Sequence, residues 1–276
     1  MKTAQRPVIA DLRARIRALE RGGGARAHTS SGTSASEASA AVLALDAGAL
    51  DEHLPEGGLP LPGLHEIAGA RDEWDDGVAA GFCLALLGRF AAARPGPLLW
   101  VARRPDLYAP GIAALGLDPG RLILTCPGSD AEALWAMEEG LRASALAAVA
   151  GEVAEPDDIA ARRLQLAAEA GGRPCFLLRR RLYAPRRAVV AIPALTRWRV
   201  TALPSAEDGP GAARAMPGRW PAGLPDRPRW RVELLRCRGA APQAFDVEWD
   251  DAAGDFALVA GIRGRALAPA AAAAAG

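Results

Sequence analysis

The chain has 276 residues, half of them hydrophobic, and a formal net charge of +1. This length and apolar content are enough for one substantial α/β domain with appendages. No stretch reaches the roughly 18 consecutive apolar residues of a membrane span, and no signal-type apolar core follows the basic start, so we expect a cytoplasmic protein without a membrane partner. The four cysteines lie far apart and form no C-x-x-C pair, which disfavours a metal site and favours buried thiols.

The N-terminal region is predicted to form a short basic amphipathic helix within residues 1–20. Its apolar side chains recur at helical spacing, at Ile9, Leu12, Ile16 and Leu19. Residues 21–40 are rich in Gly, Ser, Thr and Ala and are predicted to be a flexible linker. Two interpretations stand side by side: the helix folds back on the main domain, or its apolar face docks on another subunit or partner.

Residues 41–264 are predicted to form the main domain, and their first part alternates strand and helix patterns. The apolar runs are Leu64–Ile67, Leu98–Ala102, Leu122–Thr125, Ala147–Gly151 and Cys175–Leu178. Helical patterns separate them near residues 78–93, 106–115, 130–143 and 157–170. This alternation predicts an α/β fold with a mainly parallel central sheet flanked by helices.

Beyond residue 185 strand patterns follow one another without helices between them. They are Ala188–Ile192, Thr196–Leu203, Trp230–Arg238, Phe245–Trp249 and Phe256–Ala260. This pattern predicts an antiparallel C-terminal extension of the sheet. Residues 204–228 are predicted to be a long loop, in which Trp220 is a candidate partner-binding anchor, and the Ala-rich residues 265–276 a disordered tail.

The segment from Gly69 to Gly77 has the frame of a phosphate-binding loop between an apolar run and a helical pattern. On the G-x-x-x-x-G-K-[ST] template, the second glycine is Trp74, the lysine Asp75 and the hydroxyl residue Asp76. A working loop directs backbone N–H groups and a lysine at phosphate oxygens, and its hydroxyl holds Mg²⁺. Two carboxylates would repel a triphosphate but would suit the positive end of the following helix. The segment therefore predicts an ATPase scaffold with a degenerate P-loop.

The residues around this loop resemble the RecA-like core. The run from Gly57 to Ile67 is similar to the approach to the RecA P-loop, residues 96–118 to the next strand and helix, and residues 230–245 to the C-terminal strand pair. Together with their order, these segments cover most of residues 41–260. In this family an N-terminal helix packs on the neighbouring protomer, which is the role that the resemblance implies for the helix here.

A closer resemblance is to the ImuA family of RecA-like accessory proteins. The similar phrases are Asp106–Gly111, Leu115–Pro119, Glu132–Glu139 and Arg162–Glu169. The resemblance implies a role in the SOS response, in damage-induced mutagenesis. The partners it implies are an ImuB-type inactive polymerase relative and an error-prone DnaE-type polymerase; RecA and single-stranded DNA are further candidates. The group is also related to SulA-type cell-division inhibitors.

The catalytic positions of a RecA-type ATPase are not retained. The strand after the P-loop helix should end in a glutamate that orients water, but here it ends in Arg103 and Arg104, which cannot activate water. We interpret both as a solvated loop, with phosphate contact as the alternative. The Walker B strand of such an enzyme should end in an aspartate that supports Mg²⁺. Here Glu152 follows the apolar run Ala147–Gly151, and we interpret it as a loop residue or cap, with a metal ligand as the alternative. We therefore predict a pseudo-ATPase with no catalytic residues, metal or cofactor.

The candidate DNA-binding site is a basic stretch after the last apolar run of the parallel part. Its residues are Arg179, Arg180, Arg181, Tyr183, Arg186 and Arg187. In the RecA resemblance this stretch falls at a DNA-contacting loop, where arginines would neutralise phosphates and the tyrosine would stack on a base. The alternative is a solvated strand end whose arginines promote solubility.

The function predicted from these patterns is a non-catalytic accessory role in SOS-induced translesion DNA synthesis. Two alternatives remain open at this point: a DNA-dependent ATPase of the RecA class, and a SulA-like cell-division inhibitor.

Overall fold

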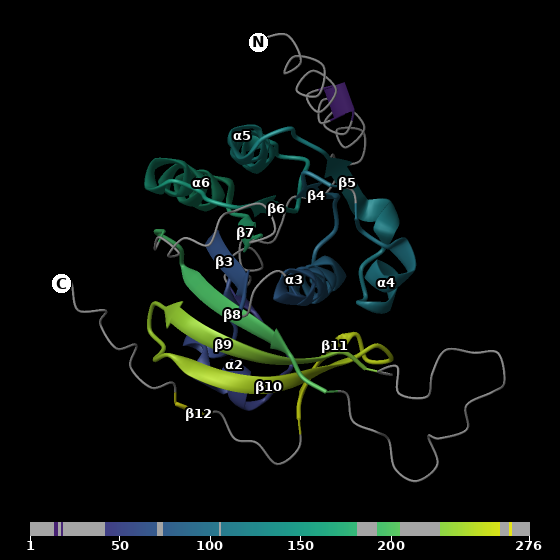
Figure 1. Ribbon diagram of the computed structural model, residues 1–276, viewed down its shortest axis with the longest axis vertical. Coiled ribbons are helices and arrows are strands. Elements are labelled where there is room, and N and C mark those ends of the chain that lie inside the picture. The colour runs from purple at the N-terminus through teal and green to yellow at the C-terminus, as the bar shows by residue number, and fades with distance from the viewer. Residues whose placement is uncertain are drawn as a thin grey trace, which may run out of the picture.

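The computed structural model describes residues 14–15, 18, 42–70, 74–104, 106–180, 192–204, 227–259 and 265–266. Within these ranges one large mixed sheet runs through the molecule, with helices on both faces (Figure 1). Its strand order is β11-β10-β9-β8-β3-β7-β6-β4-β5, and β12 pairs with β10. The predicted α/β fold class, with a mainly parallel central sheet and antiparallel C-terminal strands, is confirmed.

The parallel part of the sheet is built from the apolar runs of the first half of the chain. Its strands are β3 (Gly63–Gly69), β4 (Leu98–Val101), β5 (Leu122–Thr125), β6 (Ala148–Val153) and β7 (Pro174–Arg179). Every residue of β4, β6 and β7 is buried, because helices cover both faces of these strands. This burial explains why the strands read as continuous apolar runs.

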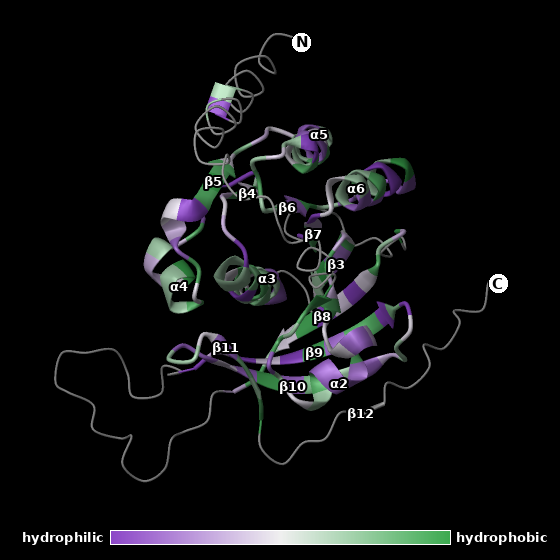
Figure 2. Cartoon of the chain, turned by 180° about the vertical axis from the view of Figure 1, so that it is seen from behind, coloured by the Kyte–Doolittle hydropathy of each residue, from purple (hydrophilic) through white to green (hydrophobic). Residues whose placement is uncertain are grey.

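The antiparallel part contains β8 (Thr196–Ala202), β9 (Arg229–Cys237), β10 (Gln243–Asp250), β11 (Asp255–Leu258) and β12 (Arg265–Ala266). Buried and less buried residues alternate along β8 and β9, as expected when only one face of a sheet packs on a core. Figure 2 shows this alternation of hydrophobic and hydrophilic residues along β9 and β10.

One strand of the extension differs from the prediction. β8 pairs in parallel with β3, from His65 opposite Thr196 to Gly69 opposite Val200, and only its other edge pairs antiparallel, with β9. A parallel pair requires a crossover connection, and the connection between β7 and β8 spans residues 180–195, of which 181–191 lie outside the described part. The predicted strand Ala188–Ile192 lies outside the described residues except for Ile192, which is not in a strand.

Helices cover the two faces of the parallel part. α3 (Trp74–Ala93) packs on one face, while α5 (Asp130–Arg142) and α6 (Asp158–Gly171) pack on the other (Figure 1). α4 (Ala109–Ala114) and the 3-10 turn Pro119–Arg121 connect β4 to β5. The small strands β1 (Val42–Leu43) and β2 (Leu59–Pro60) flank α2 (Ala49–His53) and the 3-10 turn Pro55–Gly57.

Helix α3 lies at the centre of the larger of two hydrophobic clusters. The ring of Phe82 lies 6.0 Å from the rings of Trp198 and Trp230 and 5.6 Å from that of Phe256, so it joins the parallel and antiparallel parts. Among the described helices α3 alone is long and apolar enough to span a membrane by length and composition, and 67% of its apolar window is buried inside the protein. The core helix of a globular protein meets the same criteria of length and composition.

The second cluster lies between the sheet and α5 and α6. It contains Leu64, Leu99, Met137, Leu164 and Leu177, all almost fully buried. Cys83, Cys175 and Cys237 are buried free thiols, as expected, whereas Cys126 is exposed because it follows the edge strand β5.

The predicted terminal segments fall mostly outside the described residues. Ala14, Arg15 and Ala18 are helical and exposed. Ile9, Leu12, Ile16 and Leu19, the linker and the C-terminal tail beyond residue 266 lie outside the described ranges, as does Trp220.

Candidate functional site

The carboxyl edge of the parallel strands is the place where an open α/β sheet binds its ligands, at the point where the strand order reverses. In this sheet β3 lies between β7 and β8, both of which come much later in the chain. The chain passes from β3 into α3 here, so Gly69, Ala70 and the first turn of α3 lie at the carboxyl edge of the sheet. Residues 71–73 and the side chain of Trp74 are outside the described part.

Gly69 allows the first turn of α3 to pack directly against the end of β3. A Cβ atom at residue 69 would lie 2.7 Å from Cβ of Asp75 and 2.8 Å from its carbonyl carbon, closer than real side chains approach. Asp75 and Asp76 fall in this first turn, and both side chains are buried. Carboxylates at this position interact favourably with the positive end of the helix dipole.

The N-termini of α5 and α6 carry polar side chains of the chain itself. At α5, the Ser129 hydroxyl accepts a hydrogen bond from the Glu132 N–H at 3.3 Å, and the Glu132 carboxylate accepts one from the Gly128 N–H at 2.9 Å. At α6, the Asp157 carboxylate accepts one from the Ala160 N–H at 2.7 Å. The N-termini of α3, α5 and α6 therefore all carry acidic groups in positions where a phosphate would need free N–H groups.

Glu152 lies near the carboxyl end of β6, is fully buried, and forms an ion pair with Arg180. Oε2 of Glu152 lies 2.8 Å from Nε of Arg180, whose Nη2 donates a hydrogen bond to Oδ2 of Asp106 at 2.6 Å. Burial raises the pKa of Glu152 to about 7, although the Arg180 guanidinium acts in the opposite direction. The interpretation of Glu152 as a loop residue or cap was therefore wrong, because the residue is part of a central strand.

A second buried carboxylate lies on the opposite face of the sheet. Oε1 of Glu66 on β3 is 3.7 Å from Nε of Arg179, and its Oε2 accepts a hydrogen bond from Nε of Arg197 at 2.5 Å. Arg179 and Arg180 reach different carboxylates because successive residues of an extended chain point to opposite faces. Two adjacent arginines thus neutralise one buried acid on each face.

Two arginines of the predicted DNA-binding stretch, Arg179 and Arg180, take part in these ion pairs. Arg179 and Arg180 are 6% and 5% exposed, so their guanidinium groups lie inside the protein, and this placement argues against phosphate contacts by these two side chains. Arg181, Tyr183, Arg186 and Arg187 lie outside the described residues.

The other basic pair, Arg103 and Arg104, is exposed after β4, as expected for a solvated loop. Nη1 of Arg103 lies 3.8 Å from Oδ1 of Asp130 in the first turn of α5. The Asp130 carboxylate also accepts hydrogen bonds from the N–H groups of Ala154 and Glu155, at 2.9 and 3.2 Å. Asp130 therefore links the ends of β4, β6 and α5 along the same edge.

Groups of three or more His, Cys, Asp or Glu side chains that could hold a metal ion do not occur among the described residues. His65 on β3 is fully buried, and its ring pairs with the Thr196 hydroxyl at 2.8 Å and the Leu61 carbonyl oxygen at 3.3 Å. Burial lowers its pKa to about 4, so the ring is neutral at physiological pH.

Sequence inspection did not detect the pairing of Glu152 with Arg180 or of Glu66 with Arg179 and Arg197. A signal was present, since each of these charged residues lies within or directly after an apolar strand pattern, where an unpaired charge is unfavourable. The partners could not be assigned because the strand order was not known.

The fold and the site together define an α/β protein whose predominantly parallel sheet has internal ion pairs and acidic helix N-termini at its carboxyl edge. The chain is 39% identical over 217 residues to Protein ImuA of Caulobacter vibrioides strain NA1000 / CB15N, covering 76% of this chain and 84% of the relative. Protein ImuA of strain ATCC 19089 matches to the same extent. The chain belongs to the ImuA family.

Two further comparisons add little. No family model matches the chain. A crystal structure of SulA from Pseudomonas aeruginosa is similar to part of it, with 20% identity and a TM-score of 0.36 over 42% of this chain and 96% of SulA, which is too low to support an argument about fold or function.

Proposed function

We propose that this protein is a non-catalytic accessory protein of SOS-induced translesion DNA synthesis, built on a RecA-like scaffold that has lost ATP turnover. It acts through contacts with an ImuB-type polymerase relative and the error-prone DnaE-type polymerase, with RecA and single-stranded DNA as further partners. Membership of the ImuA family supports this role. No cofactor or metal is part of the proposal.

The observation that carries the non-catalytic part is the ion pair between Glu152 and Arg180. A phosphoryl-transfer enzyme of this architecture needs a strand-end carboxylate to support Mg²⁺ beside the phosphates. Here the carboxylate at the end of β6 is held at 2.8 Å by a guanidinium of the same chain, in a buried position. A guanidinium cannot be deprotonated at physiological pH, so it competes permanently with a metal ion for this carboxylate.

The acidic first turn of α3 supports the same proposal. Asp75 and Asp76 in the first turn of α3 place negative charge at the helix N-terminus to which a working phosphate-binding loop would direct a phosphate. Electrostatic stabilisation of phosphoryl transfer requires the opposite sign of charge at this position. A scaffold in this state keeps its protein-binding surfaces, since those do not depend on a phosphate site.

ATP binding and turnover test the non-catalytic part directly. We expect the purified full-length protein to hydrolyse ATP no faster than buffer, with and without single-stranded DNA, under conditions where RecA is active. Equilibrium binding of ATP should be undetectable at micromolar concentrations. Turnover stimulated by single-stranded DNA would instead establish the RecA-class ATPase alternative.

A genetic experiment tests the accessory role. Deletion of the gene should lower ultraviolet-induced mutation frequency to the level of a deletion of the error-prone polymerase, and the double deletion should show no further decrease. Additive effects would place the protein in a separate process. Filamentation on overexpression without DNA damage, together with direct FtsZ binding, would support the SulA-like alternative.

A further inference from the structure

Helix α6 carries an apolar stripe on the side that does not pack on the sheet. Ala161, Leu164 and Ala168 are buried against the core, whereas Ile159 and Leu166 are 75% and 54% exposed. Among the described residues, only Tyr108 is a further exposed large hydrophobic side chain. Ile159, Leu166 and Ala170 are spaced at i, i+7 and i+11, so they share one face of the helix. Packing on the sheet explains why Ala161, Leu164 and Ala168 are apolar, but it does not explain the exposed apolar residues Ile159 and Leu166.

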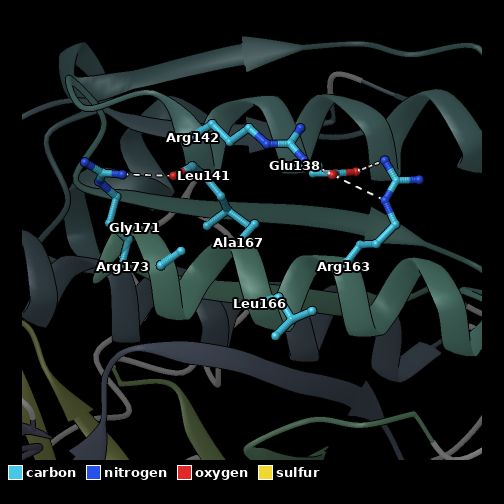
Figure 3. A pocket seen from close by; sticks show the side chains of 9 residues that line it. Glu138, Leu141, Arg142, Arg163, Leu166, Ala167, Gly171 and Arg173 are labelled. Atoms are coloured by element: carbon cyan, nitrogen blue, oxygen red, sulfur yellow. Dashed lines mark hydrogen bonds and ion pairs between the residues drawn. The ribbon is translucent and has the colours of Figure 1, made fainter.

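Leu166 lines a groove of about 730 Å³ between α5 and α6. Ala167 and Ala170 supply further apolar surface, the fully buried Leu141 lies behind it, and Glu138, Arg142, Arg163 and Arg173 supply the charged groups. Figure 3 shows Glu138 and Arg142 on α5 and Arg163 on α6 close to one another, with Leu166 on α6 pointing away from α5. The apolar surface and the arginines are therefore adjacent.

The charge of the groove is positive. Arg142 and Arg163 share the buried carboxylate of Glu138, and the Nε–H of Arg163 donates to its Oε1 at 3.3 Å. Both guanidinium groups remain accessible, with side chains 57% exposed. Arg173 adds a third positive charge where its guanidinium donates to the carbonyl oxygens of Leu141 and Ser144, at 2.9 and 3.3 Å. Nη1 of Arg142 also lies 3.3 Å from Oε1 of Glu139, so three arginines and two carboxylates leave an excess of one positive charge.

We propose that this α5–α6 groove, together with Ile159, is the docking site for an acidic amphipathic helix of a heterologous protein. Helix-in-groove recognition uses apolar anchors at i, i+3/i+4 and i+7 on the bound helix, and here these anchors would pack on Ile159, Leu166 and Ala170 of α6. Carboxylates beside those anchors would contact Arg142 and Arg163. The inference rests on the proposed accessory function, since it assigns the surface and the chemistry of a protein partner.

Charge excludes two other occupants of the groove. The N-terminal segment of the chain carries Lys2, Arg6, Arg13, Arg15 and Arg17 but only Asp11 and Glu20 within residues 1–20, so the arginines of the groove repel it. Its described residue Arg15 instead donates from Nη1 to the Leu124 carbonyl oxygen of β5, at 3.4 Å. A second copy of the chain, paired by a two-fold axis, would bring the same arginines face to face.

A complementation experiment in cells tests the groove. A strain with the gene deleted receives an empty vector, the wild-type gene, the double variant Ile159→Glu/Leu166→Glu or the matched control Tyr108→Glu, which changes an exposed apolar residue outside the groove. We expect the control to restore ultraviolet-induced mutagenesis and the double variant to reduce it roughly tenfold or more, since both exchanged side chains are anchors. Unchanged expression and an unchanged melting temperature show that the variants fold; if the double variant melts early, Leu166→Gln replaces it.

The outcomes separate the two proposals. Full restoration by a folded double variant, in a strain whose empty-vector control is deficient, would overturn the groove and leave the accessory function intact. A deletion strain with wild-type mutagenesis would overturn the accessory function itself.

The charge of the partner is tested in solution with purified full-length ImuB-type protein as the probe. Arg142→Gln removes one cation and leaves Arg163 on Glu138, so we expect it to weaken binding about two- to fivefold and to lower the salt dependence. Wild-type affinity that is independent of salt and of Arg142→Gln would overturn the acidic chemistry of the occupant.

Discussion

Nε of Arg180 lies 2.8 Å from Oε2 of Glu152, and this pair joins the chain directly after β7 to the end of β6 in the interior of the protein. The two side chains are 6% and 0% exposed, respectively. Attraction between buried charges offsets a large desolvation penalty only while both partners are present. The pair therefore constrains what each residue can do: Arg180 cannot be moved to a nucleic acid without leaving the carboxyl group of Glu152 buried without its partner.

Removal of the guanidinium should destabilise the protein strongly. We expect Arg180→Met to lower the free energy of unfolding by about 3–5 kcal/mol, because Glu152 is left buried without its partner. The double variant Arg180→Met/Glu152→Leu should recover much of this loss, since it removes both charges. Urea-induced unfolding of the three proteins measures the effect. Equal losses in the single and the double variant would show that packing, not charge pairing, determines the cost.

The pH dependence of stability should contain a contribution from Glu152 that decreases as pH rises. Its pKa in the folded protein is raised from 4.5 to about 7, so the folded state binds the proton more tightly than the unfolded state. The contribution is therefore fully present below about pH 4.5 and is lost as pH rises to about 7, a change on the order of 1–3 kcal/mol.

A difference measurement is needed to see this contribution, because His65 acts in the opposite direction. The pKa of His65 is lowered from 6.5 to about 4, so stability from this residue is lost as pH falls through that window. Subtracting the unfolding free energies of Glu152→Gln from those of the wild type between pH 4.5 and 7 leaves His65 unchanged and isolates Glu152. A difference that does not vary with pH would contradict the raised pKa.

Gly69 should prove necessary for packing in the absence of any nucleotide. We expect Gly69→Ala to lower the free energy of unfolding by about 1–3 kcal/mol, because the new Cβ would overlap Asp75 at the start of α3. Gly77→Ala is the matched control in the same helix, since a Cβ there meets no atom within 4 Å. The control should be neutral or stabilising by up to about 1 kcal/mol. Thermal or urea unfolding distinguishes the two; similar behaviour of both variants would refute the close packing.

The next prediction concerns single-stranded DNA binding by the remaining basic residues of the predicted DNA-binding stretch. Arg186→Glu/Arg187→Glu should weaken binding to single-stranded DNA and reduce the slope of log affinity against log salt by about 0.7 for each phosphate contact removed. Arg104→Glu, in the exposed loop after β4, is the control for a general change in charge. Electrophoretic mobility over a range of salt concentrations measures both. If the double variant binds as the wild type does, DNA is bound elsewhere or not at all.

The sequence was sufficient to predict the main layers of the fold. Alternating apolar runs and helical patterns marked β3 to β7 and α3 to α6, and the helix-free C-terminal patterns marked β9 to β11. These signals are local, because the burial of a strand or of a helix face determines its own periodicity. The sequence also predicted acids in the first turn of α3, because Asp75 and Asp76 come directly before the apolar helical run.

The direction of β8 and the partners of the buried charges were decided by the tertiary structure alone. The pattern of Thr196–Ala202 is compatible with a parallel or an antiparallel neighbour, and only its pairing with β3 selected the parallel arrangement. Glu152 was visible as a carboxylate and Arg180 as a cation, but their contact depends on β6 and β7 being neighbours in the sheet. The sequence by itself thus determined which segments form strands and helices and which residues are charged. The order of the strands determined which charges meet, because ion pairing acts through space, while propensity and periodicity act along the chain.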